Sequence, residues 1–219
     1  MDHEILIKAV IQQIQTDELS GKVRANAISL LGNLPDLQTL TLPFLRMLAL
    51  SENSEDRYPA ISALSRIDSP GEAETIIAGM VIMIQKQENR IHRAVGDAVR
   101  ADSQTAMIKI AEALASPTVP SESKWNVLLG ISRSLHTPHQ LEIWESSKPF
   151  LGNPSDALTY AGFCLVEYGL NEGDSNQAER ALKTLSQLLH PDWEEAIRKQ
   201  ATAQIGWLCY LFQNKPLAV

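Results

Sequence analysis

The clearest indication of the fold is the segment Val23-Arg24-Ala25-Asn26-Ala27-Ile28-Ser29-Leu30-Leu31-Gly32-Asn33-Leu34. Five apolar residues of this stretch recur at intervals of three or four and form one stripe of an amphipathic helix: Val23, Ala27, Leu30, Leu31 and Leu34. Ala27 lies in the middle of the stripe. An aspartate at position 27 is therefore expected to cost several kcal/mol, because it would bury an unpaired charge between helices.

The same pattern returns along the chain at a nearly constant interval. Aligning each copy on the residue that matches Ala27 gives the anchors Ala27, Ala60, Ala94, Leu128, Ala161 and Ala201. Successive anchors are 33, 34, 34, 33 and 40 residues apart, and an insertion around 171–176 accounts for the longer last interval. Internal repetition with this period is typical of stacked helical hairpins.

An apolar segment of helical period precedes each anchor helix, and a turn that contains proline lies in most of the junctions. These preceding segments are 4–15, 37–50, 72–87, 104–115, 140–150 and 177–189. The sequence has no alternating apolar and polar run with Gly-Asn turns, so strands are not predicted. We therefore expect an all-α fold, a single-domain α-solenoid over residues 1–219 with six hairpins of about 34 residues each.

The second helix of the first copy resembles the HEAT family of helical repeats. That family typically carries Val-Arg, then Ala, then Leu-Gly, which here are Val23-Arg24, Ala27 and Leu31-Gly32, and the stretch 197–206 matches nearly as well. Ile91 and Trp125 stand where the family has Arg, so the middle copies depart from the pattern. The resemblance covers essentially the whole chain and implies that the second helices line a concave face. It specifies the fold and leaves the function open.

Composition narrows the class of function. The net charge of −7 has the wrong sign for a general binder of nucleic acid or of anionic membranes. The sequence shows no apolar stretch of about 18 residues and no basic start before an apolar run, so neither a membrane span nor a secretion signal is expected. Two cysteines, Cys164 and Cys209, make no disulfide framework and suit the reducing cytoplasm. Both lie on apolar helices and are expected to be buried, inert thiols.

A cluster of arginines stands out in this acidic chain. Arg90, Arg93, Asp97 and Arg100 follow each other at intervals of three or four residues and so share one helix face. Guanidinium groups bind carboxylates in a bidentate manner, which makes this face a candidate grip for an anionic group of a partner. A solvated face, or an Arg–Asp ladder between neighbouring repeats, explains the same spacing.

Four large aromatic residues fall in the second helices of the later copies, namely Trp125, Tyr160, Phe163 and Trp207. Aromatic side chains exposed in a groove are typical binding hot spots, so these four are candidate partner-binding residues. Core packing between helices is the alternative explanation for these residues.

Motifs for catalysis and for metal binding are weak. His136 and His139 with Glu142 have a spacing that resembles a metal site, but Pro138 indicates a helix start between them and no cysteine is near. The segment Gly130–Ser134 lacks the last glycine of a nucleophile elbow, and no phosphate-binding glycine loop is present. We predict no catalytic residue, no metal and no cofactor.

The sequence therefore favours a non-catalytic interaction protein, an adaptor or assembly or regulatory factor that binds another protein on its concave face. One alternative is a chaperone-lyase similar to the HEAT-like proteins that attach or detach bilins on phycobiliproteins. Another is an enzyme similar to the HEAT-like alkylpurine DNA glycosylases. The latter would need a basic groove that follows the phosphates, and the net charge of −7 argues against it.

Overall fold

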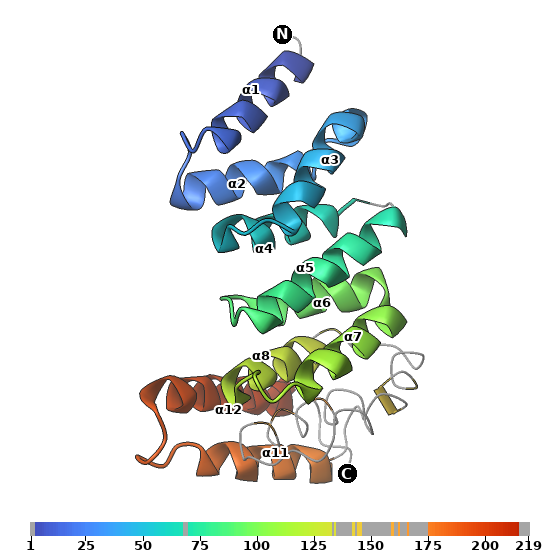
Figure 1. Cartoon of the computed structure of the whole chain (residues 1–219). Helices are drawn as coiled ribbons and strands as arrows, with labels where there is room; N and C mark the ends of the chain where they lie inside the picture. Colours follow the sequence, from blue (N-terminus) through green and yellow to red (C-terminus); the bar gives the residue numbers. More distant parts are fainter. Residues whose placement is uncertain are drawn as a thin grey trace. The chain divides into compact units, whose positions relative to one another are not determined.

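The computed structural model describes residues 3–67, 70–132 and 175–214, together with positions 134, 142, 144, 145, 159, 162 and 166. Within these residues every regular element is helical, and no strand occurs (Figure 1). The chain divides into two compact units, Met1–Ala113 and Leu114–Val219. None of the described helices is long and apolar enough to span a membrane.

The first unit consists of helical hairpins stacked on one another (Figure 1). Its helices are α1 (His3–Gln15), α2 (Gly21–Leu31), α3 (Gln38–Ala49), α4 (Ser54–Leu64), α5 (Ala73–Gln85), α6 (Ile91–Ala101) and most of α7 (Ser103–Ala115). The short 3-10 helices η1 (Pro35–Leu37) and η2 (Pro70–Glu72) lead into α3 and α5. The second helices pack in series, α2 on α4 and α4 on α6, and α3 packs on α5. The first unit therefore has two layers of helices.

The second unit is described in part. It contains α8 (Ser121–Ser132), α11 (Ser175–Gln187) and α12 (Glu195–Asn214), and α11 packs against α12. The prediction of an all-α chain is thus confirmed for the described residues, and five of the six anchors lie in helices. The anchor Ala161, most of segment 140–150 and most of the insertion around 171–176 lie outside the described residues.

The predicted phase of the first anchor helix is wrong. The side chains that α2 buries are Arg24, Ile28 and Leu31, whereas Val23 and Leu30 are both 62% exposed and Ala27 is half-buried. The apolar stripe did not predict the buried side, because α2 buries the side that faces α1 and α4 and leaves Val23 and Leu30 exposed to solvent. Because Ala27 is half-buried and not enclosed between helices, the cost of an aspartate at this position should be smaller than the sequence predicts.

Neighbouring hairpins pack with a repeated register. A Cβ atom on Gly32, five residues after its anchor, would lie 2.5 Å from the carbonyl oxygen of Ala63, three residues after the next anchor. Ser65 and Asp97 occupy the same two positions one hairpin further on, and their side chains form a hydrogen bond. The first two junctions between hairpins therefore use the same positions for contact.

A buried ion pair holds the first hairpin to the second. The Arg24 guanidinium donates to both carboxylate oxygens of Asp56, with Nε–Oδ1 at 2.6 Å and Nη2–Oδ2 at 2.7 Å. Arg24 Nη1 also donates to the carbonyl oxygen of Ile14 at 2.7 Å and to Asp17 Oδ1 at 2.9 Å. The side chains of Arg24 and Asp56 are only 9% and 2% exposed. Arg24 thus joins α1, the following turn and α4 in one polar network.

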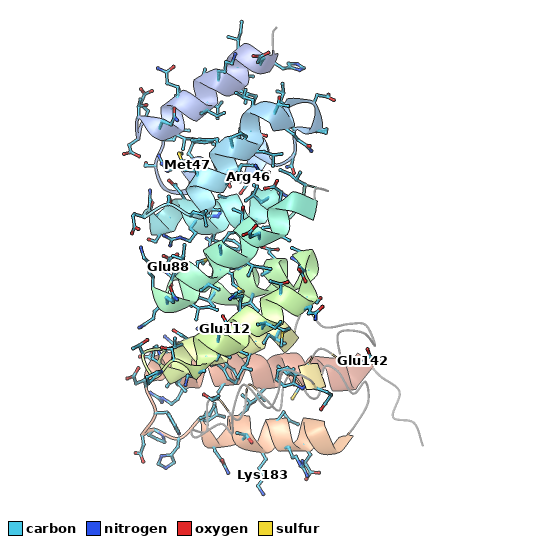
Figure 2. All side chains as sticks on the ribbon, turned by 45° about the vertical axis from the view of Figure 1, so that its right-hand side comes forward. Arg46, Met47, Glu88, Glu112, Glu142 and Lys183 are labelled. Carbon is cyan, nitrogen blue, oxygen red and sulfur yellow. The ribbon has the colours of Figure 1, made fainter. Side chains whose placement is uncertain are left out.

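The equivalent position is buried in the next three copies as well. Arg57 is fully buried and forms an ion pair with Glu88, in the loop between α5 and α6 (Figure 2 labels Glu88). Ile91 and Trp125, at the same distance before their anchors, are buried apolar residues. At this position of the repeat, the third and fourth copies therefore have apolar packing where the first two copies have a buried ion pair.

Candidate binding cleft and basic face

A cleft of about 550 Å³ lies in the first unit, where the N-terminal ends of α2 and α4 meet the loop before α6. Three of its residues are cationic, Lys22, Lys86 and Arg90. The other residues that line it are Gly21, Ala25, Ser54, Glu55, Tyr58, Pro59, Gln87, Glu88 and Asn89. The volume falls within the range of about 300–1,000 Å³ that is usual for ligand pockets.

The helix ends at this cleft add positive potential to its cationic side chains. Gly21 begins α2, Ser54 begins α4, and Arg90 directly precedes α6. The first backbone N–H groups of a helix have no partner within the helix and carry roughly half a positive charge. Three such helix ends contribute residues to one cleft.

The carboxylates near the cleft are largely neutralised by cations. Glu88 pairs with the buried Arg57 behind it, and Glu52, outside the lining, pairs with Lys86. The hydrogen bond from Lys86 holds the pKa of Glu52 below its ordinary value. Glu55 lies in the first turn of α4, where the helix dipole favours a carboxylate. The balance of charge on the cleft wall is therefore positive.

Arg90 has a backbone conformation that is rare for its residue type. Its φ of 68° lies in the left-handed region, and its guanidinium carbon lies 5.6 Å from the centre of the Tyr58 ring. A cation at this distance over an aromatic face is attracted by the ring. The contact holds the Arg90 guanidinium over one face of Tyr58, and both residues line the cleft.

A second cationic surface lies on α6 and the turn after α4. We call Arg66, Arg93 and Arg100 the basic face, and all three side chains are exposed. Arg66 and Arg100 occupy the same position of their repeats, six residues after the anchor. Arg66 Nη2 donates to the carbonyl oxygen of Ser29 at 2.7 Å, which ties it to α2.

Asp97 is the carboxylate that accompanies the basic face, and it is buried. It is 5% exposed and forms an ion pair with Arg100. Burial raises the pKa of Asp97 above its ordinary value, and this effect outweighs the opposite influence of Arg100, Ser65 and Arg66. Asp97 therefore lies in the contact between the second and third hairpins. This position corresponds to the alternative explanation of the arginine spacing, an Arg–Asp ladder between neighbouring repeats.

Replacing Asp97 with asparagine is expected to stabilise the first unit more at neutral than at acid pH. The unfolded chain releases the Asp97 proton near pH 3.8 and the folded chain releases it at a higher pH. Between these values the folded state holds more protons, so the contribution of Asp97 to stability falls as the pH rises. Urea unfolding of both proteins between about pH 3 and pH 7 should show a growing advantage of Asp97→Asn.

Asp102→Asn is the control, because its effect on the free energy of unfolding should change with pH in the opposite direction. Asp102 accepts hydrogen bonds from Thr105 Oγ1 at 2.7 Å and from Thr105 N at 3.1 Å, and these bonds lower its pKa. The wild type should therefore gain over Asp102→Asn as the pH rises from about 3 to 7. If both variants show the same sign, burial does not govern the ionisation of Asp97.

The predicted aromatic surface is not supported at the one position where the structure describes the side chain. Trp125 is fully buried in α8, and its indole Nε1 has no hydrogen-bond partner among the described residues. Its place is the core, because it occupies the inward position that Arg24 and Arg57 occupy in their hairpins. Tyr160 and Phe163 lie outside the described residues, as does the side chain of Trp207 in α12.

The expectation for the thiols is wrong for Cys209, which is exposed on α12. The helix presents this position to solvent together with Thr202, Ala203 and Gly206, spaced at helical intervals. Cys164, His136 and His139 lie outside the described residues. Among the residues that are described, no three His, Cys, Asp or Glu side chains gather as a metal site would require.

Sequence reasoning selected Arg90 but missed the cleft to which it belongs. Lys22 and Lys86 are 64 residues apart and look like isolated surface charges in the sequence. The repeat register offers a signal, because Lys22, Glu55 and Asn89 all stand five residues before their anchors. Residues at one position of successive hairpins are neighbours in a stack. The repeat register does not predict that Lys86 and Arg90, in the loop before α6, reach the same cleft.

Comparisons with known proteins yield no relative: no family model, no curated protein and no solved structure matches the chain.

Proposed function

We propose that the chain is a non-catalytic interaction protein that binds an acidic segment of a partner protein on the surface of its second helices. In this proposal the chain is an α-solenoid of six HEAT-like hairpins that acts in the cytoplasm. The observation that carries it is the basic face: Arg66, Arg93 and Arg100 are exposed, while Asp97, the carboxylate among them, is buried.

The charge distribution supports an acidic partner rather than a general polyanion. The whole chain carries a net charge of −7, so it repels nucleic acid and anionic membranes over long distances. The basic face reverses that sign locally, and exposed guanidinium groups form bidentate bonds with carboxylates. A short acidic segment can bind the basic face without coming close to the acidic remainder of the chain.

The test is a pulldown from the native cell extract, read by mass spectrometry, with wild type beside Arg93→Glu/Arg100→Glu. The double variant should lose the protein partner, because the two introduced glutamates would repel the carboxylates of the acidic segment. Lys109→Glu/Lys183→Glu is the matched control: it makes the same change in net charge at two exposed lysines that do not belong to the basic face. Circular dichroism establishes that each variant is folded.

Three outcomes would contradict the proposal. A partner retained by Arg93→Glu/Arg100→Glu would show that the basic face is not the binding surface. Nucleic acid recovered with a steep salt dependence would favour the DNA-acting alternative. A change in bilin absorption on mixing with chromophorylated phycobiliprotein subunits would favour the chaperone-lyase.

A further inference from the structure

We infer that the cleft between α2, α4 and the loop before α6 binds a phosphoryl group, carried on a side chain of the acidic segment. This inference rests on the proposed function and names the chemistry that one part of the surface recognises. Its argument comes from the cleft itself, which none of the residues of the basic face lines.

The donors of the cleft suit a group with several oxygens. Lys22 comes from the first hairpin and Lys86 and Arg90 from the third, so the cations reach the cleft from separate parts of the unit. Ser54 adds a hydroxyl group and Asn89 an amide, beside the N-terminal ends of three helices. A phosphoryl group offers three acceptor oxygens and close to two negative charges, whereas a carboxylate offers two oxygens and one charge.

The cations are available to a ligand. No described carboxylate forms an ion pair with Lys22 or Arg90, and the partner of Lys86 is Glu52, whose side chain is 95% exposed. An ion pair exposed to this degree contributes little and exchanges readily. Glu88 already has the buried Arg57 as its partner. An entering dianion therefore meets three cations and one remaining carboxylate, Glu55.

The lining also favours a side chain over a nucleotide. Tyr58 is the aromatic residue of the wall, and Arg90 already lies over its ring. The remaining apolar lining is small, Ala25 and Pro59. Arg90 therefore occupies one of the two faces of Tyr58 on which a nucleobase could stack, whereas a phosphorylated serine needs no aromatic face.

The first experiment titrates isotope-labelled protein with inorganic phosphate, replacing sodium chloride so that the ionic strength stays constant. Amide shifts should be concentrated at residues 21–25, 54–59 and 86–90. Lys22→Gln/Lys86→Gln should bind phosphate about tenfold more weakly, because two charge-assisted contacts are lost. Glu55→Gln should bind more tightly, because the remaining carboxylate of the wall is removed.

The matched control is Lys8→Gln/Lys109→Gln, which removes two exposed lysines of the same unit outside the cleft. It should leave the phosphate affinity unchanged. The inference is overturned if the control weakens binding as much as the cleft variant does, or if acetate produces the same shifts as phosphate.

The second experiment identifies the source of the phosphoryl group. An acidic peptide with one phosphoserine should bind about tenfold more tightly than its unphosphorylated form, and only wild type should show the difference. Tighter binding of adenosine monophosphate than of the phosphopeptide would make the ligand a nucleotide and overturn the inference. Failure here leaves the pulldown with the basic-face variant intact, so the two proposals fail separately.

Discussion

Arg24→Met is expected to lower the free energy of unfolding by about 3–5 kcal/mol. The substitution keeps the length of the side chain but leaves Asp56, which is 2% exposed, without its bidentate partner. It also removes the donors to the carbonyl oxygen of Ile14 and to Asp17. Breaking one side of a buried pair is costly because the other charge stays buried without compensation. Urea unfolding followed by circular dichroism measures the change.

Two further variants separate this explanation from a simple packing defect. Arg24→Met/Asp56→Leu should recover most of the loss, because the unpaired carboxylate is gone. Lys109→Met removes an ion pair with Glu112 whose side chains are both about half exposed, and should cost less than about 1 kcal/mol. A double variant no more stable than Arg24→Met would show that the charge of Asp56 is not the source of the cost.

Gly32→Ala is the second substitution with a large expected effect, a loss of about 3 kcal/mol. The φ of Gly32 is −72°, which alanine adopts freely, so the backbone conformation sets no barrier. The added Cβ would lie 2.5 Å from the Ala63 carbonyl oxygen and 2.8 Å from its Cα, both backbone atoms. Helices α2 and α4 would have to separate, which disturbs the packing between the first two hairpins.

Gly206→Ala is the matched control, since the sequence pattern gives both glycines the same role. No described atom lies within 4 Å of a Cβ on Gly206, which is exposed on α12. Alanine there should stabilise the helix by about 0.5–1 kcal/mol through its higher helix propensity. Equal effects of the two substitutions in thermal unfolding would mean that Gly32 does not contact α4.

These two glycines show how far the sequence can be read. Within the described residues, the repeat spacing predicted the helices correctly because helical hairpins recur with the period of their own length. It could not assign contacts. A Leu-Gly pattern matches in α2 and an Ile-Gly pattern in α12, but of these two glycines Gly32 meets the backbone of a neighbouring helix and Gly206 meets no described atom. Periodicity also misled in α2, where Val23 and Leu30 are apolar and yet exposed. The pattern marks an apolar side but does not say what covers it.

The candidate site was less accessible to prediction than the fold. The spacing from Arg90 to Arg100 predicted one shared helix face, but only Arg93, Asp97 and Arg100 lie on α6, and Arg90 precedes the helix in a left-handed conformation. The spacing also gave Asp97 the same status as its neighbours. Burial of Asp97 depends on the helix packed against it, which no local pattern reports. Lys22 and Lys86 carry no motif at all, and only the stacking of hairpins makes them neighbours across one cleft.

The ion pair between Arg24 and Asp56 makes the hairpins non-interchangeable. Asp56 stands four residues before its anchor, and the residue at that position of the third hairpin is Arg90. A shortened chain that joined the first hairpin directly to the third would bring Arg24 against a second guanidinium group instead of a carboxylate. Repeat arrays commonly lengthen and shorten by whole units. Here the loss of the second hairpin would carry an electrostatic cost, which favours the present order of the first three hairpins.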